Sequence, residues 1–135
     1  MKRHLYRIAI GFIGVGLWTL PAGAHHSIGA IYDTSKSIDI TGVLTKVQWE
    51  NPHMWVYLEV TDASGKVTTW EFEGASPNNV SRNGTSRKEL FSNIGKTVTV
   101  RAIPARNGAP RGSAESMTVG EGTALIIGTN NETRN

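Results

Sequence analysis

The sequence contains no cysteine. A disulfide framework is therefore excluded, and the fold has to be held together by its core alone. A thiol nucleophile and a lipoprotein signal, both of which need a cysteine, are excluded as well. Three further enzyme signatures are missing: the Gly-x-Ser-x-Gly turn, the His-Glu-x-x-His zinc motif and a phosphate-binding glycine loop. We therefore expect a protein that is not an enzyme.

Long hydrophobic runs are also lacking. The longest, residues 8–20, has about 13 residues, which is short of the roughly 20 needed to span a bilayer. It follows a basic stretch, residues 2–7, and precedes Ala22-Gly23-Ala24, which has the small residues of a cleavage site. This pattern predicts a secretory signal peptide over residues 1–24, cleaved after Ala24, and a periplasmic protein. An uncleaved anchor helix and release from the cell are the alternatives.

After this expected cleavage, the remaining chain has no excess of positive or negative charge. The signal peptide holds three of the 14 Lys and Arg residues, which leaves 11 against 11 Asp and Glu. A general nucleic-acid-binding protein would carry a basic surface. We therefore expect no nucleic-acid partner, and no membrane span after cleavage.

The rest of the chain predicts one domain over residues 25–128 and a polar tail over residues 129–135. Apolar and polar residues alternate in six short runs separated by turn residues, as they do in half-buried strands. These runs are residues 38–49, 53–60, 66–73, 97–103, 114–119 and 124–127. A phase shift at Gly42 predicts a β-bulge there. Ser76-Pro77 and the capping-box pattern from Ser86 to Glu89 predict two short helices between the third and fourth strands.

The order of these elements indicates the fold class. Three strands, a helical connection and two or three further strands match a Greek-key barrel of the OB type. We therefore expect an all-β protein with a short helical connection, folded as an OB-like small barrel of five to six strands. An open antiparallel sandwich is the alternative.

Several short motifs resemble those of a known family. They are Ala24-His25-His26-Ser27, Gly42-x-Leu44-Thr45-Lys46-Val47-x-Trp49-x-Asn51-Pro52-His53, Trp70-x-Phe72-Glu73 and Ser76-Pro77-Asn78. On these residues the chain resembles the DUF6152 family of exported bacterial proteins of unknown function. The resemblance covers nearly all of the mature chain. It departs from the family pattern at Thr85, where a tryptophan is expected, and at Lys88, where an acid is expected. The resemblance implies no activity.

Histidines suggest a metal site. Those of the mature chain are His25, His26 and His53, and cleavage after Ala24 would give His25 a free α-amine beside its imidazole. With His53 as a third nitrogen, these groups would form a histidine brace, an arrangement suited to copper(II). His26 is an alternative or additional ligand. Acidic and sulfur side chains that could assist are Glu50, Glu59, Glu73 and Met54, although strand alternation points Met54 away from His53.

The histidines also have a purely structural interpretation, in which the N-terminal pair is a solvated stub and His53 caps the turn after Pro52. A different functional interpretation rests on the aromatic residues. Trp55 and Tyr57 share a face of the second strand, and with Trp70 they would form a stacking surface for a small ligand or protein of the cell envelope. The structural alternative is that at least two of the four residues Trp49, Trp55, Tyr57 and Trp70 belong to the core.

Overall fold

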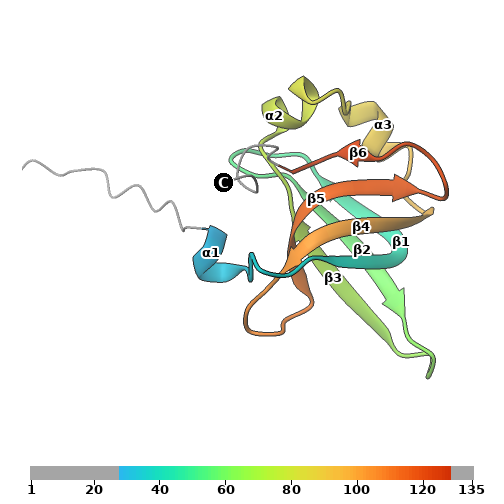
Figure 1. The fold of residues 1–135 in the computed structure, drawn as a ribbon. Coiled ribbons are helices and arrows are strands. Elements are labelled where there is room, and N and C mark those ends of the chain that lie inside the picture. Colours follow the sequence, from blue (N-terminus) through green and yellow to red (C-terminus); the bar gives the residue numbers. More distant parts are fainter. Residues whose placement is uncertain (1–27, 129–135) are drawn as a thin grey trace, which may run out of the picture.

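The computed structural model describes residues 28–128, and Figure 1 shows their fold. Three short helices and six strands make up this part of the chain. The helices are α1 (Ile28–Ile31), α2 (Pro77–Arg82) and α3 (Arg87–Phe91). The strands are β1 (Ile38–Gln48), β2 (Trp55–Thr61), β3 (Val67–Glu73), β4 (Thr97–Pro104), β5 (Arg111–Val119) and β6 (Leu125–Ile126). The signal peptide, the two N-terminal histidines and the polar tail that the sequence predicts lie outside the described residues.

The strands form a closed barrel with one extra strand. They pair in the order β3-β2-β1-β4-β5-β6, and each neighbouring pair is antiparallel. A parallel pairing of β3 with β5, in which Phe72 lies opposite Gly112, closes β1 to β5 into the barrel. The expectation of an OB-like small barrel is confirmed, and the open sandwich is wrong.

The core fills the inside of the barrel with alternate residues of each strand. Leu44, Val56, Leu58 and Phe72 are fully buried there. Helices α2 and α3 lie across one end of the barrel (Figure 1), where buried residues of both helices join the same core. The side chains of the predicted caps accept hydrogen bonds from backbone N–H groups three residues ahead, Ser76 from Asn79 and Ser86 from Glu89, which satisfies donors left free at a helix start. The two predicted helices are therefore confirmed.

The predicted bulge is real but lies elsewhere on β1. Gly42 pairs in regular register with Val98 of β4, and the register against β2 shifts between Leu44 and Lys46. A glycine is needed at position 42 for another reason, because a Cβ there would lie 2.6 Å from the carbonyl oxygen of Glu59. The expected phase shift at Gly42 is wrong, because Val43 is exposed and Leu44 is buried, and the alternation shifts only at the bulge between Leu44 and Lys46.

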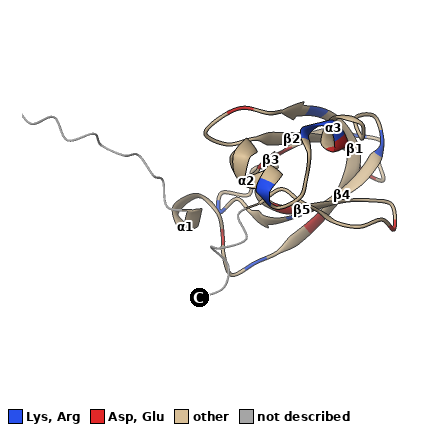
Figure 2. Ribbon diagram, turned by 90° about the horizontal axis from the view of Figure 1, so that it is seen from above, with Lys and Arg blue, Asp and Glu red and all other residues tan. Residues whose placement is uncertain are grey.

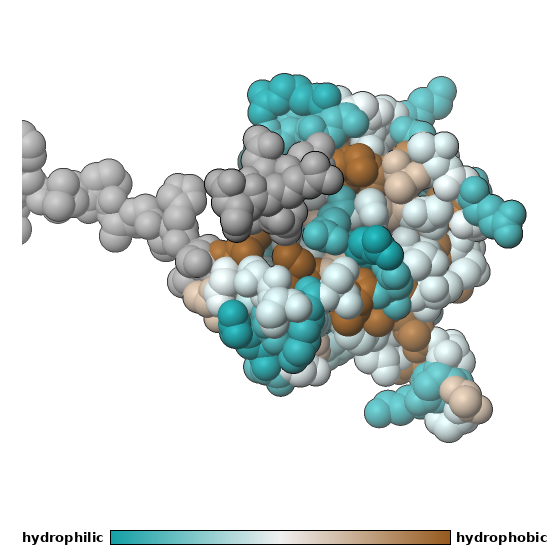
Figure 3. Space-filling view, viewed as in Figure 1, coloured by the Kyte–Doolittle hydropathy of each residue, from teal (hydrophilic) through white to brown (hydrophobic). Residues whose placement is uncertain are grey.

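The surface carries both charges in a mixed pattern. Figure 2 shows lysine and arginine residues and acidic residues scattered over the ribbon. Figure 3 shows hydrophobic residues on one face in groups interrupted by hydrophilic ones. The exposed large hydrophobic residues come from separate parts of the fold, and they are Ile31, Val43, Val67 and Ile94. None of the helices in residues 28–128 has the length and hydrophobicity to cross a membrane.

Candidate functional site

His53 lies at the entrance to β2, next to the end of β3. Its ring nitrogen Nδ1 lies 3.1 Å from the carbonyl oxygen of Gly74 and 3.6 Å from Oε1 of Glu73. Both neighbours are hydrogen-bond acceptors, so in the neutral ring the proton belongs on Nδ1, which donates to Gly74. The other nitrogen, Nε2, then keeps its lone pair. Because the side chain is 48% exposed, this lone pair is available to a ligand that approaches from solvent.

Glu73 connects His53 to a residue far away in the sequence. Its second oxygen, Oε2, accepts a 2.7 Å hydrogen bond from the hydroxyl of Tyr32. The ring of Tyr32 is buried, and this burial is the main cause that raises the pKa of its hydroxyl; the hydrogen bond to Glu73 adds to the effect. The tyrosine therefore stays protonated and acts as a donor, and the carboxylate lies between a tyrosine and a histidine.

Backbone contacts hold Tyr32 in this position. The segment from Ile28 to Asp33 runs beside the β4–β5 connection, where Tyr32 forms a bridge with Ala105. The N–H of Asp33 donates to Pro104 at 2.8 Å, and the N–H of Arg106 donates to Ile31 at 3.0 Å. The start of the described chain is therefore fixed on the same side of the barrel as the end of β3.

Trp55 and Tyr57 lie on the outer face of β2, as the strand alternation predicts. A cation lies over a face of each ring: the guanidinium of Arg111 is 5.3 Å from the centre of Trp55, and Nζ of Lys46 is 4.8 Å from the centre of Tyr57. Arg111 also forms a 2.7 Å ion pair with Glu71 of β3. A flat ligand that stacked on these rings would have to displace the cations or share the rings with them.

Trp70 does not join this aromatic face. It lies opposite Leu58 in the β2–β3 pair and packs against the core, with its ring stacked on Phe72 at a centroid distance of 5.8 Å. Trp49 also packs against the core. The expectation that Trp70 joins the stacking surface is therefore wrong. Trp70 and Phe72 share the face of β3 that points into the closed barrel.

Of the four residues expected to assist a metal site, one has its side chain close to the ring of His53. Met54 is fully buried in the core, as the alternation predicts. Glu50 accepts a 3.1 Å hydrogen bond from Gln48, and Glu59 lies further along β2, opposite Val43. Only Glu73, of the three acids proposed from the sequence, is in an ion-pair contact with His53 among the described residues.

The site at His53 is incomplete by itself. Within residues 28–128, no three His, Cys, Asp or Glu side chains lie close enough together to hold a metal ion. The other histidines proposed as ligands, His25 and His26, precede the first described residue by two or three positions. A metal site at His53 of the kind expected from the sequence would take its other ligands from outside residues 28–128.

The comparison with protein families gives one match. The profile of a family of unknown function, DUF6152, matches residues 15–114. The chain belongs to the DUF6152 family. The matched range contains all three candidate histidines together with Tyr32 and Glu73, and it ends within β5 of this DUF6152 chain. Comparisons with curated proteins and with solved structures return no match.

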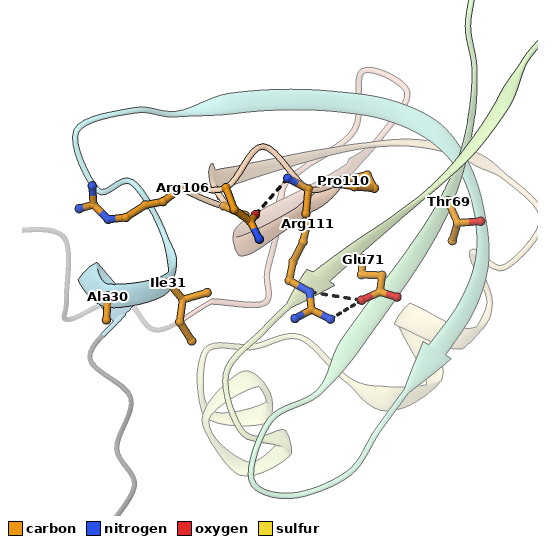
Figure 4. A pocket seen from close by; sticks show the side chains of 10 residues that line it. Ala30, Ile31, Thr69, Glu71, Arg106, Pro110 and Arg111 are labelled. Atoms are coloured by element: carbon orange, nitrogen blue, oxygen red, sulfur yellow. Dashed lines mark hydrogen bonds and ion pairs between the residues drawn. The ribbon is translucent and has the colours of Figure 1, made fainter.

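A pocket of about 500 Å³ lies beside the aromatic face. It lies between α1, β3 and the β4–β5 connection, and Figure 4 shows the ion pair of Glu71 and Arg111 along one side. Ile31 of α1 supplies an apolar wall of the pocket. Arg106, which belongs to the β4–β5 connection, extends toward α1. The N–H at Nε of Arg106 already donates to the carbonyl oxygen of Gly29 at 2.7 Å.

Nothing in the sequence indicates that Tyr32 belongs to this site. It lies 41 residues before Glu73, at the end of a short apolar run that predicts only burial. The Arg111–Glu71 pair was missed for a similar reason, because it depends on the parallel pairing of β3 with β5. His53 and Glu73, by contrast, both belong to short motifs that can be recognised in the sequence.

Proposed function

We propose that this protein is an exported, periplasmic metal-binding protein that holds copper(II) between its mature N-terminus and His53. The ligands would be the α-amine and imidazole of His25 and Nε2 of His53, with His26 as an alternative or additional ligand. The role would be metal handling or delivery, without a catalytic step. Export and cleavage after Ala24 are part of the proposal, since only cleavage creates the amine ligand.

The observation that carries the proposal is the environment of His53. A histidine that binds a metal through one ring nitrogen usually donates from the other to a carbonyl or carboxylate oxygen, which fixes its orientation and tautomer. Nδ1 of His53 has both kinds of acceptor nearby, Gly74 at 3.1 Å and Glu73 at 3.6 Å. This environment of the half-exposed ring supports the proposal that Nε2 of His53 binds a metal.

The choice of copper(II) follows from the donor types. Nitrogen ligands in tetragonal geometry suit copper(II), which leads the affinity order of the divalent first-row metals. Copper(I) prefers sulfur ligands, and both methionines of the described residues, Met54 and Met117, are fully buried. The site would therefore favour the oxidised ion.

A second candidate function is binding of a small envelope ligand or protein without a metal. It is favoured by the pocket of about 500 Å³ beside Trp55 and Tyr57, which offers an apolar wall and the cations Arg106 and Arg111. Arg111, which covers Trp55, also lines this pocket. A ligand seated there would contact both surfaces. Such binding would not depend on how the N-terminus is processed.

A copper(II) titration followed by electron paramagnetic resonance separates the two candidates. The protein starting at His25 should bind one equivalent and give an axial signal with nitrogen hyperfine structure. A version acetylated at the His25 amine lacks that ligand, and His53→Ala lacks the third nitrogen, so both should lose this signal. Equal and weak binding by all three proteins would overturn the metal proposal and leave the envelope ligand as the candidate.

A further inference from the structure

One edge of β3 is paired along only part of its length. Its residues Glu71 to Glu73 pair in parallel with Arg111 to Ser113 of β5. Within residues 28–128, Val67 to Trp70 pair with β2 alone. Figure 1 shows the reason, because the hairpin of β2 and β3 extends beyond the rest of the barrel. The half of β3 next to the hairpin therefore has an open edge.

The strand register shows which backbone groups face this edge. In an antiparallel pair, successive residues turn their N–H and C=O groups alternately toward the partner strand and away from it. The N–H of Glu71 points away from β2, because it donates to the carbonyl oxygen of Pro110 at 3.0 Å. Thr69 and Val67 precede Glu71 by two and four residues, so their backbone groups point away from β2 as well. No hydrogen bond joins these groups to another backbone group of the described chain.

Pro110 explains why the pairing stops at Glu71. In the parallel ladder, the next hydrogen bond toward the hairpin would run from an N–H at position 110 to the carbonyl oxygen of Thr69. Proline has no N–H, so it cannot be the donor. An unpaired strand edge is a template for another chain. When an extended peptide adds to such an edge, main-chain hydrogen bonds supply affinity and alternate side chains supply specificity.

The open edge borders the pocket of about 500 Å³. Thr69 lines this pocket at one side and Arg106 at the other, with the ion pair of Glu71 and Arg111 between them (Figure 4). The charged lining residues carry one net positive charge, because Glu71 and Arg111 neutralise each other. The side chain of Arg106 is 51% exposed, and its ion pair with Asp33 is long, at 3.9 Å. The pocket is therefore complementary to a chain with an acidic group.

We propose that the open edge of β3 at Val67 to Thr69 binds an extended peptide segment of another protein as an added strand, with an acidic side chain of that segment facing Arg106. The inference names the ligand class for the second candidate function and rests on it, and it is independent of the metal. The charge of the pocket favours an acidic segment over a second copy of this chain, whose own pocket carries the same positive charge.

Hydrogen exchange measured by NMR on the protein that starts at His25 tests the edge. In the free protein the amides of Val67 and Thr69 should exchange faster than those of Thr68 and Trp70, which face β2. The probe is the pentapeptide Thr-Val-Thr-Val-Asp, acetylated at its amino end and amidated at its carboxyl end. At saturation the probe should slow exchange at Thr69 by at least about tenfold and leave exchange at Trp70 unchanged.

Two N-methylated probes separate main-chain binding from side-chain binding in the unchanged protein. Successive N–H groups of an added strand face alternately toward β3 and away from it. One probe is methylated at the nitrogens of both valines, and the other at the nitrogens of both threonines. The version that loses the N–H groups facing β3 should bind about tenfold more weakly or worse, and the other should bind like the parent probe. No difference between the two versions would overturn strand addition.

Thr69→Pro removes the matching N–H from the protein. Proline is tolerated on an edge strand where its N–H would face solvent, and Thr69→Val is the control that keeps the N–H. Thr69→Pro should weaken binding of the parent probe by about tenfold, and Thr69→Val should leave it unchanged. Circular dichroism establishes that both variants are folded. The methylated probes act on the unchanged protein, so they decide the question without Thr69→Pro.

The acidic preference is tested by replacing the aspartate of the probe with asparagine. In the unchanged protein this replacement should weaken binding by about two- to fivefold, the effect of an exposed ion pair. In Arg106→Gln the two probes should bind alike. Equal binding of both probes by the unchanged protein would overturn the role of Arg106.

The remaining outcomes separate this inference from both candidate functions. If Thr69 becomes protected as the concentration of the protein alone rises, with self-association in sedimentation velocity, the edge serves a second copy and the proposal is overturned. It is also overturned if no probe protects Thr69. A probe that perturbs only the amides of Ile31 and Arg111 leaves the second candidate function standing without strand addition. The copper(II) titrations are read independently of all these results.

Discussion

The groups next to Nδ1 of His53 set the orientation and the tautomer of its ring. A free imidazole on a surface loop rotates and can bind a proton at either nitrogen, so it is a poor ligand until it is oriented. Here Gly74 and Glu73 occupy the Nδ1 side. The neighbouring Trp55 begins β2 and pairs with Glu73, so the strand register brings the histidine and the carboxylate together.

Gly74 is expected to be intolerant of a side chain. A Cβ there would lie 2.7 Å from the carbonyl oxygen of Ile127 and 2.9 Å from Cγ of Met54. Gly74→Ala should therefore lower the free energy of unfolding by about 1–3 kcal/mol, as overpacking in a core does. Urea unfolding measures this change. A loss below about 0.5 kcal/mol, the usual range of surface substitutions, would mean that Met54 and Ile127 move aside without cost.

Asp33 should make stability depend on pH in the acid range. Its hydrogen bonds, first with Lys36 and then with Ser35, lower the pKa of its carboxyl from 3.8 to about 2. A depressed pKa in the folded state gives stability that is complete above the ordinary value and is lost as the pH falls through the folded value. Wild-type protein should therefore be more stable than Asp33→Asn above about pH 4, and the difference should shrink toward pH 2.

Urea titrations of both proteins at several pH values check this expectation. The other acids with lowered pKa values, Asp39 and Asp62, are present in both proteins and cancel in the difference. Two curves that stay parallel from pH 6 to pH 2 would contradict the role of Asp33.

At the scale of elements, the sequence predicts where the strands lie but not which strands pair with one another. Apolar alternation places β2 and β3 within two residues of their observed bounds. The fifth strand was expected from Ala114, yet β5 begins at Arg111. Its first three residues pair in parallel with β3, and such a pairing leaves no alternation in a short segment that contains Gly112.

Some residues of the candidate site could likewise be proposed from the sequence, but not all of their contacts could. His53 and Glu73 could be proposed from their motifs, because histidine and carboxylate chemistry is visible in residue type. The contact of Glu73 with Tyr32 could not, since it depends on α1 packing beside the β4–β5 connection. Trp70 was misassigned because an aromatic residue on a strand looks the same in sequence whether it faces solvent or a closed barrel.

The short strand β6 should contribute far more stability than its length suggests. Ile127, directly after it, is fully buried, and its carbonyl oxygen accepts a 2.8 Å hydrogen bond from Ala75. Ile127→Ala should lower the free energy of unfolding by about 2–5 kcal/mol, the usual cost of truncating a buried aliphatic side chain. Ile126→Ala is the control, because Ile126 is only half-buried. Equal small losses in urea unfolding for both would show that the end of the domain is not part of the core.

At the scale of the whole molecule, closure of the barrel depends on few contacts between β3 and β5. Their parallel pairing spans Glu71 to Glu73 and Arg111 to Ser113, and the ion pair of Glu71 and Arg111 lies at its end. Both side chains of that pair are more than a third exposed. Exposed ion pairs typically contribute less than about 1 kcal/mol, so burial of Phe72 against the core has to stabilise the closure.

The double-mutant cycle of Glu71→Gln and Arg111→Gln tests this view of the closure. The coupling free energy from urea unfolding should lie below about 1 kcal/mol and decrease further at high salt. A coupling of about 3 kcal/mol or more, the range seen when a buried pair is broken, would mean that the ion pair itself holds the barrel closed.

A metal that bridges the N-terminal segment and β2 should stabilise the entire domain. A ligand that binds only the folded state at 100 times its Kd raises the free energy of unfolding by about 2.7 kcal/mol. In a domain of about 100 residues, each kcal/mol raises Tm by about 4–8 °C, so copper(II) should raise it by roughly 10–20 °C. Differential scanning calorimetry of the protein that starts at His25 measures this shift. The version acetylated at the His25 amine should not respond, because that nitrogen can no longer bind copper. A comparable rise in both proteins would place the copper elsewhere on the surface.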